Sequence, residues 1–223
     1  FVLTLVLVSC DKKLGELNIS RTNATSINPV FLLNNAVINS SFPARTLIFD
    51  IGIVQQMVSP NGGVLAGANF NQDSRDGTIG AIWGAYYQNV IKYTKDAISK
   101  TKDVPARSNL YNMCRIYQAY MFMILTDEYG EIPYTEAGNG FLEQVLLPKY
   151  DKQDIIYADI IKELGEASAA LNVSNPIESA DFLYAGNIAK WKKFGYSLLL
   201  RAGMRLSKVD PTKAQATVAA AFA

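Results

Sequence analysis

The stretch RSNLYNMCRIYQAYMFMILTDEYGEIPY, residues 107–134, decides the fold of this chain. Its side chains recur at three- and four-residue spacing, which places them on one face of a helix. The residues on this face are Leu110, Met113, Cys114, Tyr117, Tyr120, Met121, Ile124 and Glu128. Gly130 favours the left-handed conformation that ends helices, and Pro133 prevents the helix from restarting nearby. The sequence therefore predicts a buried helix that ends in an acidic and aromatic elbow, residues 127–134.

The composition indicates a folded globular protein with balanced charge. Of the 223 residues, 49% are hydrophobic, and 21 basic side chains balance 20 acidic ones. No nucleic-acid partner is expected, because phosphates select a basic surface. The sequence contains no histidine, which excludes Ser-His-Asp and Cys-His catalysis and every His-ligated metal site built by this chain alone. We expect no cofactor and no metal.

The two cysteines are too few for a disulfide framework. Cys114 lies on the apolar face of the helix described above, where a thiol packs as a small hydrophobic group. Cys10 follows the apolar run FVLTLVLV, which is too short to span a bilayer. Residues 7–10, LVSC, resemble the bacterial lipobox, in which a signal peptidase cuts before a cysteine that carries lipid. Cys10 is therefore the predicted lipidation site.

These features divide the chain into three parts. Residues 1–9 are expected to be a truncated lipoprotein signal peptide, because the initiating Met and the basic n-region are missing. Residues 10–27 are polar and are expected to form a tether, held to the membrane by lipid such as palmitate on Cys10. Residues 28–223 form the folded part. Alternatively, residues 1–8 form a buried first strand and Cys10 is there by chance.

The folded part contains further helical patterns separated by loops. Helical spacing of apolar residues recurs in 28–58, 78–101, 151–171, 188–206 and 210–223. The loops span 59–77, 138–149 and 172–187. Ser-Ser-Phe-Pro at 40–43 interrupts the first pattern, and Asp151 and Asp210 are the expected N-caps of two helices. No alternating run is long enough for a sheet, so we predict an all-α fold of antiparallel helix pairs.

Three blocks of sequence carry a family resemblance. They are DEYGEIPY at 127–134, PKYD at 148–151 before the next helix, and AKWKKF at 189–194 running into LRAGMRL at 200–206. In this order the blocks resemble the SusD/RagB family of nutrient-binding outer-membrane lipoproteins. The resemblance implies a SusD-like helical fold with tetratricopeptide-like helix pairs and long loops, and a lipid anchor at the outer-membrane surface.

The resemblance also implies a partner and a role. The partner would be a SusC-type TonB-dependent transporter, over which the lipoprotein acts as a lid that captures glycan or peptide. Family members are roughly twice as long as this chain. Residues 28–223 are therefore expected to be the N-terminal part of the SusD-like domain, with the C-terminal half missing.

The acids of the elbow have two interpretations. Asp127, Glu128 and Glu131 could act as paired acids in general acid–base chemistry. Alternatively they are structural, because carboxylates at a helix C-terminus call for compensation by a cation. We expect the second role, with Arg201 pairing with Asp127 or Glu128. The predicted structural residues of the elbow are Asp127, Glu128, Tyr129, Gly130, Pro133 and Arg201.

A ligand site is expected in the 59–77 loop, which mixes an aromatic ring with amide and carboxylate groups suited to sugars. The candidate ligand-binding residues are Asn69, Phe70, Asn71, Gln72 and Asp73. Alternatively, this is a solvated loop with Phe70 in the core. Four other aromatic residues lie on apolar helical stripes and are expected in the core: Trp83, Tyr86, Tyr87 and Trp191.

The sequence thus predicts a cell-surface lipoprotein that binds glycan or oligosaccharide and delivers it to a SusC-type transporter. It predicts no enzyme activity and no catalytic residue. The alternative function is a helical-repeat scaffold that binds protein segments and no nutrient. A glycan-cleaving enzyme is a third and weaker alternative.

Overall fold

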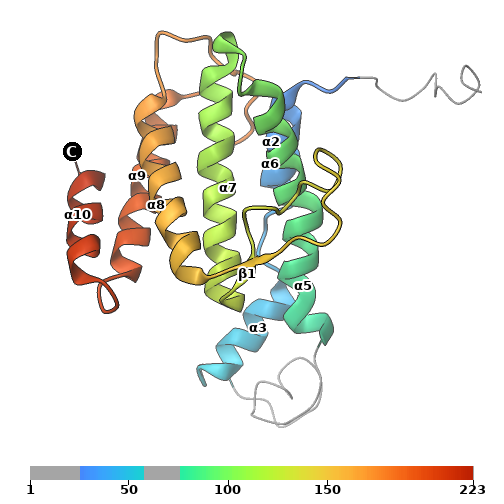
Figure 1. The fold of residues 1–223 in the computed structure, drawn as a ribbon, viewed down its shortest axis with the longest axis vertical. Helices are drawn as coiled ribbons and strands as arrows, with labels where there is room; N and C mark the ends of the chain where they lie inside the picture. The colour runs from blue at the N-terminus through green and yellow to red at the C-terminus, as the bar shows by residue number, and fades with distance from the viewer. Residues whose placement is uncertain (1–25, 58–75, 223) are drawn as a thin grey trace, which may run out of the picture.

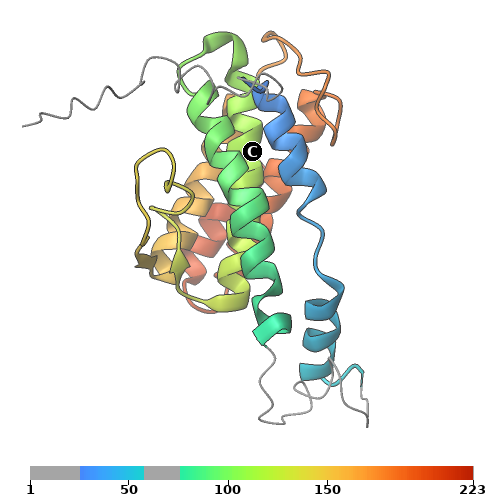
Figure 2. The same cartoon turned by 90° about the vertical axis from the view of Figure 1, so that its right-hand side faces the viewer.

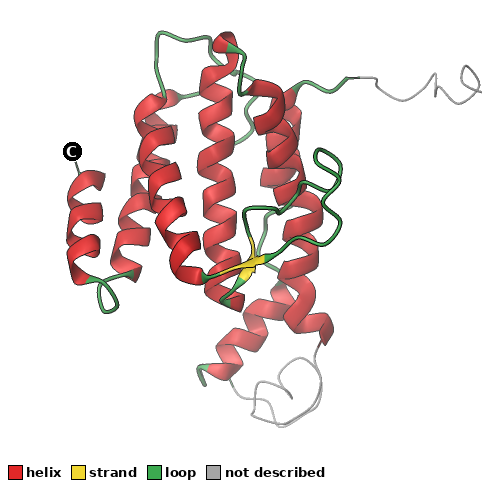
Figure 3. Cartoon of the chain, in the orientation of Figure 1, coloured by secondary structure: helices red, strands yellow, loops and turns green. Residues whose placement is uncertain are grey.

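The computed structural model describes residues 26–57 and 76–222, and this part of the chain is all-α, as predicted (Figure 3). The helices are α2 (Pro29–Ile38), α3 (Ala44–Ile53), α5 (Asp76–Tyr86), α6 (Lys92–Thr101), α7 (Ser108–Tyr129), α8 (Gln153–Ala170), α9 (Ile188–Arg205) and α10 (Pro211–Ala221). A π-helical turn, Tyr87–Ile91, joins α5 to α6, and a short 3-10 turn, Pro105–Arg107, precedes α7. The strands are β1 (Ile132–Pro133) and β2 (Tyr150–Asp151), which pair in antiparallel fashion.

Helix α7 lies at the centre of the bundle, with α6 on one side and α8 on the other (Figure 1). Beyond α8, α9 packs against α8, and α10 packs against α9. Each helix from α7 to α10 runs opposite to the one before it, so the chain forms the predicted antiparallel pairs. On the other side, α2 lies along α6, as Figure 2 shows.

The core is built around α7, because most of its residues are buried. Cys114 is fully buried there, as predicted, and burial raises the pKa of its thiol. Tyr120 and Ile124 are only half-buried. Helix α7 ends at Tyr129, and Gly130 follows with a φ of 74°, in the left-handed region that glycine tolerates. The predicted end of this helix is confirmed.

Two tyrosines hold the segment between α2 and α3. The Tyr86 hydroxyl donates a hydrogen bond of 2.9 Å to the carbonyl oxygen of Ser40, and the Tyr117 hydroxyl is hydrogen-bonded to the Ser40 side chain. Asn28 caps α2, and Pro43 is the residue that precedes the first turn of α3. The interruption predicted at 40–43 is therefore a fixed connection between two helices.

The role of Asp151 differs from the predicted one. Lys152, not Asp151, is the N-cap residue of α8, and its side chain makes no capping hydrogen bond. The Asp151 carboxylate instead accepts hydrogen bonds from the backbone N–H groups of Tyr134 and Thr135, at 3.2 and 2.8 Å, and from the Thr135 hydroxyl. Pairing of β1 with β2 brings these groups together, so a non-local contact replaces the cap. The predicted cap at Asp210 is confirmed, since its side chain accepts from Lys213 N–H.

A buried carboxylate organises the connection between α8 and α9. Asp181 is 3% exposed and accepts hydrogen bonds from three backbone N–H groups, those of Leu183, Tyr184 and Gly186. It also accepts from the indole nitrogen of Trp191 at 2.7 Å. These donors compensate the burial of the charge. The loop is thereby fixed to the start of α9.

In the described ranges, no helix combines the length and the apolar character that crossing a bilayer requires.

Candidate functional site

Two of the predicted sites lie outside the described residues. These are the lipidation site, Cys10, and the candidate ligand-binding residues Asn69, Phe70, Asn71, Gln72 and Asp73. The chain on either side of the 58–75 segment is described: α3 ends at Ile53, residues 54–57 follow it, and α5 begins at Asp76. Helix α5, whose Trp83 contacts Tyr129 of the elbow, is therefore the described element that directly follows the predicted ligand site.

Asp127 connects the ends of three helices. Its carboxylate accepts hydrogen bonds from the Tyr157 hydroxyl of α8, at 2.5 Å, and from the Arg205 guanidinium of α9, at 2.7 Å. We expected Arg201 as the cation, but Arg205, one helical turn further along, forms the ion pair, and Arg201 is exposed. Burial and the hydrogen bond to Asp127 raise the pKa of Tyr157.

Glu128 lies in a different setting from Asp127. Burial raises its pKa, and the nearby carboxylates of Asp50 and Asp127 add to this effect. In the part of the chain that the structure describes, no group of three or more His, Cys, Asp or Glu side chains could hold a metal ion.

An aromatic cluster lies beside the elbow, formed by Trp83, Tyr87, Tyr129 and Tyr150. The Trp83 ring stacks on Tyr150 with 5.9 Å between centroids, meets Tyr129 edge-on at 5.3 Å and lies 4.8 Å from Tyr87. The Tyr87 hydroxyl donates to the carbonyl oxygen of Pro133 at 2.6 Å, which fixes the cluster to β1. Tyr150 is 61% exposed, so the cluster presents an aromatic face at the surface.

The four aromatic residues expected in the core divide into two groups. Tyr86 and Trp191 are fully buried, as predicted. Trp83 and Tyr87 are half-buried, because both belong to the cluster at the surface. Tyr150 was not a candidate in the sequence, although its position in PKYD, directly before a helix, brings it next to the elbow.

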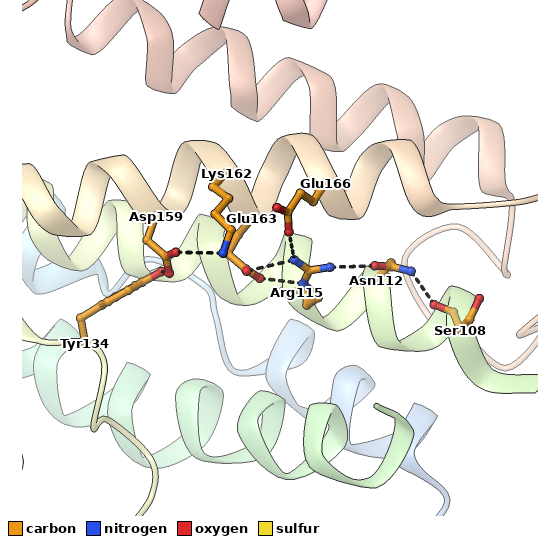
Figure 4. A network of polar contacts seen from close by, with 8 residues as sticks. All are labelled: Ser108, Asn112, Arg115, Tyr134, Asp159, Lys162, Glu163 and Glu166. Carbon is orange, nitrogen blue, oxygen red and sulfur yellow. Dashed lines mark hydrogen bonds and ion pairs between the residues drawn. The ribbon is translucent and has the colours of Figure 1, made fainter. Parts of the chain in front are cut away.

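A polar network joins α7 to α8 (Figure 4). The Arg115 guanidinium donates to both carboxylate oxygens of Glu163, at 2.7 and 2.9 Å, and to Glu166 at 2.9 Å. The hydrogen bond with Glu163 is the main cause of the raised pKa of Arg115. One turn earlier in α8, Asp159 accepts a hydrogen bond from the Tyr134 hydroxyl at 2.8 Å. The two acids that bind Arg115 lie three residues apart in α8, so they face the same side of the helix.

A cavity of about 300 Å³ opens beside this network. Its walls come from α6, α7 and α8, and Tyr134 and Thr135 close one side. It shares no lining residue with the aromatic cluster. The cavity and the aromatic cluster are therefore separate candidate places for a ligand.

Comparison with known proteins identifies relatives of one kind. The family model SusD-like_2, described as "Starch-binding associating with outer membrane", matches residues 21–223. No match was found among curated sequences.

Several solved structures resemble this chain. One described as a chitin-binding protein is 32% identical, with a TM-score of 0.77, over 87% of this chain and 42% of its own. A SusD-like protein described as Bacteroidetes AC2a is 31% identical, with a TM-score of 0.75, over 88% of this chain and 37% of its own. A SusD homologue from Parabacteroides distasonis is 27% identical, with a TM-score of 0.70, over 87% of this chain and 38% of its own. The chain therefore spans 37–42% of the length of these relatives.

Proposed function

Because this chain belongs to the SusD-like family, we propose that it is a cell-surface lipoprotein that captures glycan and delivers it to a SusC-type TonB-dependent transporter. The observation that carries this proposal is the family match over residues 21–223, together with 32% identity to a protein described as chitin-binding. Chitin and starch oligosaccharides are therefore the first ligands to try. The role is binding without cleavage.

The capture surface combines the 59–77 loop with the aromatic cluster. Sugar rings have an apolar face that stacks on aromatic side chains, while their hydroxyls need amide or carboxylate partners. Tyr150 offers an exposed ring that Trp83 supports from behind. Residues 69–73 supply the polar groups, and the loop that contains them leads directly into α5, the helix of Trp83. Both parts would contact one oligosaccharide.

The 138–149 loop provides a surface for the transporter. Two of its side chains, Phe141 and Leu147, are 87% and 91% exposed, and Leu146 is also largely exposed. The loop is nevertheless folded, because the backbone N–H groups of Glu143 and Val145 both donate to the carbonyl oxygen of Asn139. Large apolar side chains held at a surface indicate a protein contact. We assign this contact to the transporter and the membrane attachment to lipid on Cys10.

The direct test of capture is retention of the purified protein on insoluble chitin and on insoluble starch. Retention on at least one, with no soluble sugar released, is the expected result. Release of sugar would instead favour a glycan-cleaving enzyme. Passage through both materials with full retention on a peptide library would favour the helical-repeat scaffold.

The anchor and the partner have separate tests in cells. Labelled palmitate is expected in the full-length protein and not in its Cys10→Ala variant; unlabelled wild type would contradict the anchor. For the partner, Phe141→Ser with Leu147→Ser is expected to abolish co-purification of a TonB-dependent transporter. The matched control is Phe182→Ser, which changes an exposed aromatic residue in a different loop. Equal loss in this control would contradict the assigned surface.

A further inference from the structure

The cavity between α6, α7 and α8 has a balanced set of charges. Lys95 of α6 and Arg115 of α7 are its two cations, and Asp159 and Glu163 of α8 are its two carboxylates. The lining is therefore close to neutral. An anion would meet two carboxylates there, and a cation would meet two positive groups, so a charged ligand gains little from this lining.

Several polar groups of the cavity have hydrogen-bonding capacity left over. Among the described residues, the Lys95 ammonium makes no hydrogen bond or ion pair, although it is partly buried. Burial lowers the pKa of Lys95, and the carboxylates of Glu143, Glu163 and Asp159 oppose that shift from a distance. The Gln118 amide nitrogen donates to Thr94, which leaves the Gln118 carbonyl oxygen as an acceptor.

The two carboxylates of the cavity, Glu163 and Asp159, differ in how many hydrogen bonds they already accept. Glu163 is engaged by Arg115 through both oxygens, and Arg115 also binds Glu166 and Asn112. Figure 4 shows this network, and its members Arg115 and Glu163 line the cavity. Asp159 accepts one hydrogen bond, from Tyr134, and forms a looser ion pair with Lys162 at 3.9 Å, so its carboxylate retains lone pairs for a further donor. Lys95 thus offers an unused donor, and Asp159 offers a partly used acceptor, in the lining of one cavity.

The remaining lining is apolar and aromatic. Phe122, Ala119 and Ile98 contribute carbon surface, and the Tyr134 ring meets Phe122 at 4.6 Å between centroids. An apolar lining with a few converging polar groups is the usual composition of a small-molecule site, and a volume of about 300 Å³ is at the lower end of the usual range. The occupant must therefore be small.

We propose that this cavity binds one neutral, polyhydroxylated ring, the size of a single sugar unit, through Lys95, Gln118 and Asp159. A hydroxyl group donates and accepts at once, so the hydroxyls of one ring match an ammonium donor and a carboxylate acceptor in the lining of one cavity. The apolar C–H face of the ring would lie on the carbon surface of Ile98, which is half-buried. The site is distinct from the capture surface and does not depend on it.

The charge balance gives the first test, which needs only the wild-type chain. Binding of D-glucose and N-acetyl-D-glucosamine is measured by ligand-observed NMR and compared with that of glucuronate, an anion, and glucosamine, a cation. At least one neutral sugar is expected to bind roughly tenfold more tightly than both charged analogues. Equal or tighter binding of a charged analogue would overturn the proposal, as would no saturable binding of either neutral sugar up to about 100 mM.

The second test locates the binding. Lys95→Met removes the ammonium at nearly constant length, and the neutral sugar is expected to bind roughly tenfold more weakly. The matched control is Lys190→Met, which removes an exposed lysine of α9 and leaves the affinity unchanged. Unchanged affinity in Lys95→Met would overturn the assignment to this cavity. Retention on insoluble chitin or starch is read separately and is expected to survive in Lys95→Met, so failure here differs from failure of the capture role.

Discussion

Gly195 of α9 has no room for a side chain, because it faces Ser168 of α8. A Cβ atom at Gly195 would lie 2.0 Å from the Ser168 hydroxyl oxygen and 3.1 Å from its Cβ. Among the described residues, the Ser168 hydroxyl is the buried side-chain group that lacks a hydrogen-bond partner. The close approach of α8 and α9 therefore depends on these two small residues.

The Gly195→Ala variant is expected to lower the free energy of unfolding by about 1–3 kcal/mol, because the two helices must move apart. Urea denaturation measures this change. The control is Gly165→Ala in α8, where no atom lies within 4 Å of the added Cβ, and alanine there is expected to stabilise by up to about 1 kcal/mol. Ser168→Ala in the Gly195→Ala background should recover part of the loss. Equal stability of Gly195→Ala and wild type would contradict this packing.

Tyr86 gives a prediction on alkaline stability. Burial raises the pKa of its hydroxyl to about 12 from 10.0. The folded state therefore favours the neutral phenol, and this contribution is fully present below the unfolded pKa of about 10. It is lost as the pH rises through the folded pKa. Stability should fall between about pH 10 and 12 and fall less steeply in Tyr86→Phe, measured by urea denaturation at stepped pH. Identical slopes in both proteins would contradict the assignment.

At the scale of elements, the C-terminal ends of α7 and α9 are joined by one surface ion pair, Asp127 with Arg205. The Arg205 side chain is 56% exposed, so water and salt weaken the attraction. We therefore expect the pair to add little to the free energy of unfolding. Its main effect is to set how the two helix ends lie against each other. The Tyr157 hydroxyl, on the same carboxylate, connects the start of α8 to this junction.

Arg205→Met is expected to lower the free energy of unfolding by at most about 1 kcal/mol, and less at high salt. Arg201→Met is the matched control, because it removes the same charge one turn earlier on the same helix, and we expect no change. Thermal unfolding at low and high salt measures both variants. A larger loss in Arg201→Met than in Arg205→Met would restore the pairing that the sequence suggested.

At the scale of the whole molecule, local patterns predicted the elements well. The apolar spacing in 107–134 and Gly130 gave α7 and its end, because both depend on neighbours three or four residues away. The predicted roles of Asp151 and Arg201 were wrong, and both for the same reason. Asp151 turns to the backbone at 134–135, and Arg205 rather than Arg201 meets Asp127, because contacts between distant segments decide both.

The candidate sites were less predictable than the helices. Trp83 and Tyr87 follow an apolar stripe, which does not tell a buried ring from one at the edge of the core. Their partner Tyr150 lies far along the chain, and β1–β2 pairing brings it close. The cavity beside Lys95 depends on how α6, α7 and α8 sit together, which no spacing rule describes. The residues at 69–73 remain a sequence-based proposal.

The central claim is that this protein captures glycan through an exposed aromatic face, and a titration of affinity tests it most directly. Isothermal titration with soluble oligosaccharides of chitin and of starch should show saturable binding for at least one of them. Tyr150→Ala should weaken this binding roughly tenfold, because stacking on one aromatic ring is lost, whereas Phe182→Ala, another exposed aromatic, should leave it unchanged. Wild-type protein that binds neither class of oligosaccharide would contradict the account.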